Sequence, residues 1–478
     1  MVRYRRLQDF PVEERIDALI RNLKECEQRC DFSASGNRRE EFSRMEMKRR
    51  MLVDAVDFLN NTPGVFSNVE IYEPIVDMAR ANLFRAIPLN EEAEDLFEPE
   101  DDEPQLERAW PHLQIVYEIL RRMVAAPDLD VKAARTVLDH NFVLGMLDLF
   151  ASPDPREREY AKTIFHRLYG KLLSLRSFVR KSLQNAFTRY VAENRCHTGI
   201  AEMLEILGSI INGFSIPLKE DHRNFLQHTL IRLHLPSSLP SYHVQLCFCL
   251  IQFIRKEPEL VVHITYSLIR YWPVTHSRKA VMFLNELEEI MEFVVPDQFD
   301  EVADIVFDRL VQCIKSPHFQ VAERALFFWN NEYVVQLVLY RKERFVPLLV
   351  PALLSNVEQH WNSNVRSLSG NVMNLLMEMD ADLVEKHMAK HMAGYEAPDP
   401  VRLRLAEQNR VFDMLDQLNK SGKPTTPQRG SENGETIANI IKRLRDEAHV
   451  RAGRAVTNGT SSSRTSSSEE IFTLDPQM

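Results

Sequence analysis

A short turn-forming or polar cluster that opens an apolar helical stretch recurs along this chain at nearly constant spacing. The clusters are marked by Pro153, His197, Pro240, His276, Pro317 and His360, and the steps between them are 44, 43, 36, 41 and 43 residues. An antiparallel helix pair of the HEAT or armadillo kind needs roughly 40–47 residues per repeat. Neither helix of such a pair can bury its apolar face alone, so neighbouring pairs must stack. The spacing therefore predicts an all-α fold, a curved superhelical solenoid with a long side-chain-lined surface suited to binding other proteins.

The composition favours helices and excludes several functions. Glycine is scarce, with 14 in 478 residues, about 3% against an average of roughly 7%, whereas sandwiches, barrels and Rossmann sheets need glycine at their turns and phosphate loops. The formal net charge of −10 argues against a nucleic-acid partner, which requires a basic footprint. The sequence has no apolar run of about 18 residues, so we expect no membrane span. Six cysteines do not make a disulfide framework, which favours a reducing cytoplasmic or nuclear location.

Four segments can be distinguished along the chain. Residues 1–110 are helical but irregular, as expected of the end cap of a solenoid, and include a strongly acidic loop over 91–103. Residues 111–393 carry the HEAT-like repeats. Residues 394–420 contain a charged stretch that could form a helix, and residues 421–478 are dominated by polar residues and predict a disordered tail. The acidic loop is either a solvated connector or an electrostatic arm that guards a basic site.

Motifs for catalysis or cofactor binding are almost absent. The sequence lacks G-x-G-x-x-G, G-x-x-x-x-G-K-[S/T], H-E-x-x-H, G-x-S-x-G and paired C-x-x-C, so we predict no catalytic residues and no cofactor. Cys26 with Cys30, and His387 with His391, have the four-residue spacing of two metal ligands on a helix. A zinc site takes three or four protein ligands, so both pairs are interpreted as structural and no metal is predicted.

One group of residues is too polar for an ordinary core stripe. His166, Tyr169, Leu173 and Arg176 are spaced i, i+3, i+7 and i+10. On one continuous helix these positions project within about 80° of one another. They would present an imidazole, a phenol, an aliphatic group and a guanidinium on a single face.

Solenoid geometry predicts what lies beside that face, because positions one repeat apart become lateral neighbours. Adding 43 to 46 residues takes His166 to Ile210, and takes Arg176 to the stretch 219–222. The prediction is a pocket with apolar walls and a cationic end, and the alternative is that its isoleucines are simply core between repeats. The pocket residues are Tyr169, Arg176, Ile206, Ile210, Lys219 and His222.

Several uninterrupted runs of the chain resemble the B-prime class, also called the 56-kDa class, of regulatory subunits of the serine/threonine protein phosphatase 2A. The likeness spans roughly residues 10–393. It departs from the family at Val244, where the family often has proline, and after Met379. The matching runs are 154–158, 166–171, 199–214, 217–220, 282–289, 316–324 and 329–333.

The resemblance implies a non-catalytic targeting subunit that binds the scaffold and catalytic subunits of the phosphatase. It also implies a groove between two repeats that recruits substrate or adaptor proteins through a short Leu-x-x-Ile-x-Glu motif. Residues 98–103 lie where the family has an acidic segment. The family's motif-binding residues fall here on His166, Arg167, Tyr169, Arg176, Ile206, Ile210, Lys219 and His222.

Two other functions remain as alternatives at this stage. The first is a helical-repeat adaptor for transport or the cytoskeleton that is unrelated to any phosphatase. The second is a helical-repeat enzyme that uses His166, Tyr169 and Arg176. Nothing in the sequence supplies a nucleophile or a metal for the latter, so the chain is expected not to be an enzyme.

Overall fold

Every regular element in the described ranges is a helix. The structure is a computed structural model, and it describes residues 4–32, 38–87, 105–193 and 198–393. These residues belong to one unit that extends from Met1 to Tyr395. The acidic loop over 91–103 and the segments 394–420 and 421–478 lie outside the described residues. Among the described helices, none is long and apolar enough to cross a membrane.

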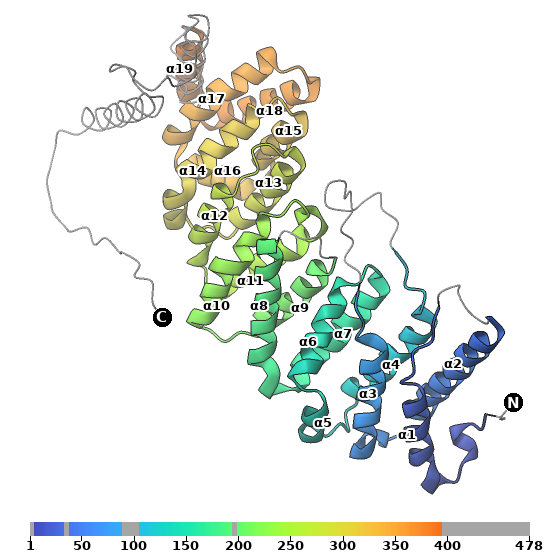
Figure 1. The fold of residues 1–478 in the computed structure, drawn as a ribbon. Coiled ribbons are helices and arrows are strands. Elements are labelled where there is room, and N and C mark those ends of the chain that lie inside the picture. The colour runs from blue at the N-terminus through green and yellow to red at the C-terminus, as the bar shows by residue number, and fades with distance from the viewer. Residues whose placement is uncertain (1–3, 33–37, 88–104, 194–197, 394–478) are drawn as a thin grey trace, which may run out of the picture. The chain divides into compact units, whose positions relative to one another are not determined.

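The helices stack in two rows, and in the first row each helix contacts the next one (Figure 1). The first row consists of α2 (Arg38–Asn61), α4 (Trp110–Ala125), α7 (Pro155–Lys171), α9 (Ile200–Asn212), α11 (His243–Lys256), α13 (Ser277–Met291), α15 (Phe319–Leu326) and α18 (Ser363–Met379).

The second row packs against the first, with contacts such as those between α3 and α4, α14 and α15, and α17 and α18. A π-helical turn over Leu226–Leu230 and a 3-10 turn over Ile231–His234 extend α10 and contact α8. A short helix, α16 (Glu332–Tyr340), connects the rows near the end of the array. The second row consists of α1 (Arg15–Glu25), α3 (Tyr72–Leu83), α5 (Val131–Val137), α6 (His140–Asp148), α8 (Arg176–Glu193), α10 (Glu220–Phe225), α12 (Leu260–Arg270), α14 (Pro296–Ile314), α17 (Lys342–Gln359) and α19 (Ala381–Met392).

The predicted turn clusters mark the starts of the first-row helices. The six clusters precede α7, α9, α11, α13, α15 and α18 in that order. Two of them supply a capping side chain: the Asp154 carboxylate accepts from the Arg156 N–H, and the His276 ring accepts from the Lys279 N–H. Such caps satisfy backbone donors that a helix start leaves open. The fold prediction of a helical-repeat solenoid is therefore confirmed.

Side-chain hydrogen bonds between neighbouring repeats show the same period. Many of them join residues that are 39 to 45 positions apart in the sequence, close to the spacing predicted from the turn clusters. Examples are Arg158 with Glu202 (44), His243 with Glu286 (43) and Asn356 with the backbone of Ile314 (42).

A buried charged network fixes three consecutive repeats at the middle of the array. Glu286 on α13 is fully buried and accepts from His234 Nε2 at 3.0 Å and from His243 Nε2 at 2.9 Å. His234 Nδ1 lies 2.8 Å from the Ile231 carbonyl oxygen. Both ring nitrogens of His234 therefore face acceptors, so both must carry a hydrogen and the ring is an imidazolium. Lys279 extends the network by donating to the carbonyl of His234 and to two others in the same turn.

The pKa values of the network agree with this geometry. Burial alone would raise the pKa of Glu286, but His234 and His243 outweigh it and hold the pKa at about 2. Burial alone would lower the pKa of His234, but Glu286 outweighs it and raises the pKa above its ordinary value. Burial lowers the pKa of Lys279 to about 8.

Replacing Glu286 by glutamine should lower the free energy of unfolding by about 3–5 kcal/mol, because it leaves a buried imidazolium without its counter-charge. The Glu286 contribution is present above its unfolded pKa of about 4.3 and is lost as the pH falls towards 2. The His234 contribution is present below its unfolded pKa of about 6.5 and is lost as the pH rises through the raised folded value. The loss of unfolding free energy in Glu286→Gln, measured by urea unfolding, should therefore be largest near pH 5 to 6.

The matched control is Glu289→Gln, one helical turn away at an exposed position of α13. It should change stability by less than about 1 kcal/mol. Equal losses for the two variants, or a deficit that does not vary with pH, would contradict the assignment of an ion pair.

Candidate functional site

The chain turns sharply between α7 and α8, and this corrects one sequence prediction. The continuous helix assumed for residues 166–176 is wrong: α7 ends at Lys171, a 3-10 turn covers Leu173–Leu175, and α8 begins at Arg176. Leu172 and Leu175 are both buried at this turn, whereas Leu173 is 64% exposed. Burial of the two leucines between the rows accounts for the bend, since a continuous helix would carry the chain past the core.

The turn nevertheless brings Tyr169 and Arg176 together. Arg176 donates from Nε to the Tyr169 carbonyl at 3.0 Å and from Nη2 to the Gly170 carbonyl at 3.1 Å. These are carbonyls that the end of α7 leaves unpaired. The guanidinium carbon also lies 5.1 Å from the centre of the Tyr169 ring, which is within the range of a cation–π contact.

Arg180 is a functional candidate that the sequence analysis missed. Its Nη1 donates to the Tyr169 hydroxyl at 3.1 Å. Because it follows Arg176 by four residues, it lies on the same face of α8. The four-residue spacing could have identified Arg180 from the sequence, but only if α8 had been predicted to begin at Arg176.

Three contacts connect α7 to α9 along one side, one repeat apart. They join Arg158 Nε to Glu202 Oε1 at 2.7 Å, Lys162 Nζ to Glu205 Oε2 at 2.7 Å and His166 Nε2 to Ser209 Oγ at 2.8 Å. The predicted lateral neighbour of His166 was Ile210, so the observed register differs by one residue.

The two isoleucines of the predicted apolar wall lie beneath the surface. Ile206 is 2% exposed and Ile210 is 3% exposed, and both belong to the hydrophobic core. A peptide side chain can reach them only if neighbouring side chains move aside. The exposed apolar groups closest in sequence to the cations are Leu173 and Ile216, the latter 69% exposed.

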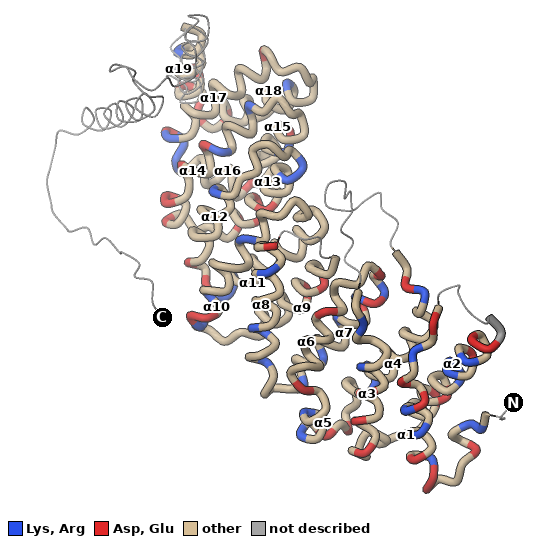
Figure 2. Tube along the Cα trace, viewed as in Figure 1, with Lys and Arg blue, Asp and Glu red and all other residues tan. Residues whose placement is uncertain are grey.

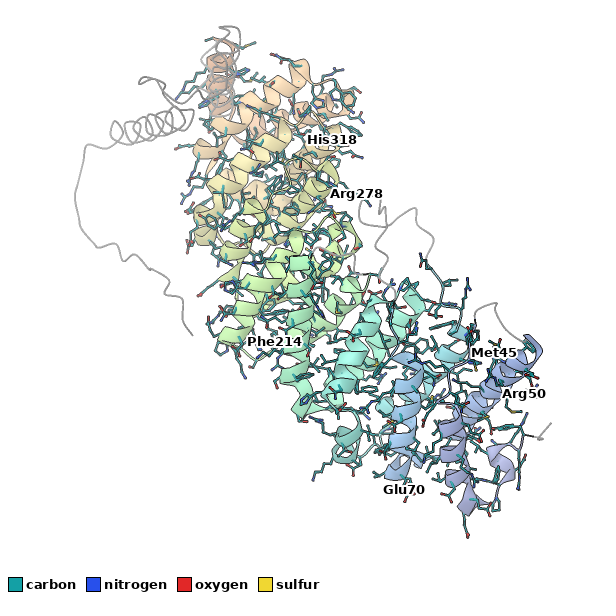
Figure 3. The ribbon with its side chains drawn as sticks, viewed as in Figure 1. Met45, Arg50, Glu70, Phe214, Arg278 and His318 are labelled. Carbon is teal, nitrogen blue, oxygen red and sulfur yellow. The ribbon has the colours of Figure 1, made fainter. Side chains whose placement is uncertain are left out.

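His222 lies on α10, after the loop that follows α9. Its ring stacks on Phe214 with a centroid distance of 3.7 Å and an interplanar angle of 8°, and Figure 3 labels Phe214. Burial lowers the pKa of His222 below its ordinary value, and Arg180 and Lys219 lower it further. Arg180 therefore contacts Tyr169 and lies near enough to His222 to lower its pKa, which links these two predicted residues.

Arg167 forms no hydrogen bond with Tyr169, Arg176 or His222 in the described ranges. It is exposed and lies close to Lys171, where burial lowers the pKa of the lysine amine and Arg167 lowers it further. We define the cationic site as Tyr169, Arg176, Arg180, Lys219 and His222.

Positions of Lys and Arg are interspersed with positions of Asp and Glu along the helices (Figure 2). Neighbouring cations are paired with acids: Arg158 with Glu202, Lys162 with Glu205, and Arg223 with Glu257. Within the described ranges, Arg176, Arg180 and Lys219 form no ion pair with any acidic side chain. The site is therefore an open positive field, which favours an anionic group from outside the chain.

Other candidates from the sequence do not gather into sites. Cys26 is buried, which raises the pKa of its thiol to about 12, and Cys30 is partly exposed. The part of the chain that the structure describes contains no group of three or more His, Cys, Asp or Glu residues placed to hold a metal ion. A cavity of about 330 Å³ opens at the far end of α8, with Thr188, His228 and Tyr271 among its lining residues.

A two-row stack of helix pairs with an unpaired cationic surface beside a tyrosine defines a helical-repeat binding protein. Comparison with known families makes this specific. The chain belongs to the protein phosphatase 2A regulatory B subunit family, the B56 family, whose family model matches residues 5–399. It is therefore a non-catalytic regulatory protein, and the alternatives of an enzyme and of an unrelated adaptor are set aside.

Curated relatives from animals and plants support this. The delta isoform of the human 56 kDa regulatory subunit is 42% identical over 413 residues, covering 86% of this chain and 68% of that protein. The B' gamma isoform of the 59 kDa regulatory subunit from Arabidopsis thaliana is 45% identical over 414 residues, covering 86% and 78%. The Caenorhabditis elegans regulatory subunit pptr-1 is 42% identical over 380 residues, covering 80% and 69%.

The contacts between α7 and α9 should differ in strength. Arg158 is largely buried and also donates to the Ser152 and Pro153 carbonyls, so Arg158→Met should cost about 1–3 kcal/mol of unfolding free energy. Lys162 pairs with more exposed acids, so Lys162→Met should cost less than about 1 kcal/mol. Urea titration measures both, and a larger loss for Lys162 would contradict this ranking.

Proposed function

We propose that this chain targets protein phosphatase 2A by binding its scaffold and catalytic subunits and by capturing substrates at the cationic site. The captured element would be a linear peptide with a Leu-x-x-Ile-x-Glu motif. The observation that carries the proposal is a set of three cations without acidic partners in the described ranges. Arg176 and Arg180 contact Tyr169, and Lys219 acts on the nearby His222. The phosphatase nucleophile and metals would reside on the catalytic subunit.

The acidic residue of the motif would contribute most to fixing the orientation of the bound peptide. Its carboxylate could accept charge-assisted hydrogen bonds from Arg176, Arg180 or His222. Each such bond contributes on the order of 1.5–3 kcal/mol. A glutamine in its place would keep the shape but lose the charge.

The two apolar residues of the motif would bury against the aromatic and aliphatic part of the site. Each contributes about 1.5–3 kcal/mol when fully buried. Access to Ile206 and Ile210 needs a rearrangement of covering side chains, so part of this gain is offset. Ordering a flexible peptide and losing its translational freedom offset several kcal/mol more. The balance suggests roughly micromolar affinity, near −8 kcal/mol.

Tyr169→Ala combined with His222→Ala should abolish binding of a Leu-x-x-Ile-x-Glu peptide, because it removes the ring beneath Arg176 and the partner of Phe214. Isothermal titration calorimetry should show a loss of at least about 100-fold, or about 2.8 kcal/mol. The phosphatase scaffold and catalytic subunits should still co-purify with the variant.

The matched control replaces Tyr271 and His228 by alanine at the far end of α8. It should bind the peptide as the unmodified chain does. Unchanged peptide affinity in the Tyr169 and His222 variant would refute this site. Failure of the unmodified chain to co-purify the phosphatase subunits would refute the targeting role.

Binding should weaken as salt is raised, because an open positive field is screened by mobile ions. Between about 0.05 M and about 0.5 M salt we expect a several-fold loss of affinity for the motif peptide. A peptide with Gln in place of the motif Glu should be weaker at low salt and less sensitive to its increase. Affinity that is independent of salt would argue against the electrostatic role.

A further inference from the structure

One ring nitrogen of His222 is shielded from ligands and the other is open to them. Nδ1 is buried and has no hydrogen-bond partner within the described residues. One face of the ring is covered by Phe214 at 3.7 Å. The residue as a whole is partly exposed, so Nε2 is the nitrogen that can meet a ligand.

The charges around this ring come from two helices. Arg180 on α8 and Lys219 at the start of α10 act to lower its pKa after burial, and Asp221 beside it acts in the opposite direction. Arg223, one residue further along α10, is already occupied by Glu257 and Glu220. The free ring is therefore neutral at pH 7, because its ordinary pKa is about 6.5 and these effects lower it.

We propose that His222 takes up a proton when the carboxylate of an acidic peptide docks on the cationic site, so that peptide capture and protonation of this ring occur together. This inference rests on the proposed function. The proton comes from the buffer and adds to the ring nitrogen that lacks a hydrogen. The ring then has an Nε2–H that donates to the incoming carboxylate. Its second N–H, at the buried Nδ1, has no acceptor within the described residues, so it offsets part of this gain.

The physical cause is the change in local charge. In the free chain, a proton on His222 adds a third positive charge beside Arg180 and Lys219. A bound carboxylate brings a negative charge into the same cluster and offsets that repulsion, which favours the imidazolium. Binding and protonation are linked reciprocally, so lower pH must tighten binding of the carboxylate peptide. The limit is about tenfold per pH unit, in the range between the free and bound pKa values.

The consequence is selectivity that depends on pH. A peptide with glutamate in the last motif position gains affinity as the pH falls from about 8 to about 6, and its glutamine counterpart does not. His222 thus distinguishes a carboxylate from its neutral isostere more strongly than the fixed charges of Arg176 and Arg180 do alone.

The test is calorimetric titration of the full-length chain with a synthetic Leu-x-x-Ile-x-Glu peptide. It is done at pH 7 in two buffers with different ionisation enthalpies, phosphate and Tris. The difference in observed enthalpy gives the number of protons taken up, which should lie between about 0.5 and 1. The peptide with Gln in the last position should take up none.

His222→Gln should bind more weakly and show no buffer dependence. His228→Gln is the matched control, since this exposed histidine lies on the next turn outside the cationic site, and it should keep the full proton uptake. Uptake that persists in His222→Gln would move the proton to another group and overturn the inference.

The outcomes separate the two proposals. Binding without proton uptake by the unmodified chain overturns the role of His222 and leaves the peptide site standing. No binding of the motif peptide in either buffer overturns both. A decline of affinity with falling pH also overturns the inference, because the linkage requires the opposite sign.

Discussion

The structure depends on the lateral stacking of helix pairs, in which each pair buries an apolar face that it cannot bury alone. This constraint sets the spacing of many contacts between repeats, which join residues 39 to 45 positions apart. The same stacking allows polar side chains of one repeat to form hydrogen bonds and ion pairs with the next repeat. The imidazolium of His234 and the carboxylate of Glu286 come from different repeats, so their pairing helps to fix how the two repeats are placed. The position of the cationic site depends partly on the same stacking, since α8 follows α7 through a short turn and then packs against the helical turns that extend α10.

The fold could be predicted from the sequence because the repeat signal is local. Turn-forming residues such as Pro153 and Pro317 mark helix starts whatever lies around them, and their spacing gives the architecture. The helix break at Leu172 could not be predicted in this way. It follows from burial of Leu172 and Leu175 in a core whose shape is known only after the rows are assembled. The prediction of one continuous helix was wrong, but its consequence that Tyr169 and Arg176 lie close together is correct. The chain turns back after α7, so Arg176 reaches the end of that helix.

The site was predicted less completely than the fold, for reasons that concern side-chain geometry. Arg180 was missed because its contact with the Tyr169 hydroxyl crosses from one row to the other. The burial of Ile206 and Ile210 depends on side chains from neighbouring helices, and periodicity cannot distinguish a pocket wall from core. A related limit is visible in α13, where residues 287–292 spell Leu-Glu-Glu-Ile-Met-Glu and match the motif itself. Leu287 and Ile290 are fully buried in a helix, so this match cannot serve as a ligand.

Net charge says little about what such a surface binds. The chain carries a formal charge of −10, yet Arg176, Arg180 and Lys219 leave a positive field because no acid of the described residues pairs with them. The first two turns of α7 show the opposite arrangement, in which Arg158 and Lys162 are neutralised by α9. An anionic peptide therefore meets general repulsion from the acidic chain and attraction only where cations are unpaired. This combination favours specificity over affinity, because the acidic surface elsewhere on the chain repels an anionic peptide and so disfavours binding outside the cationic site.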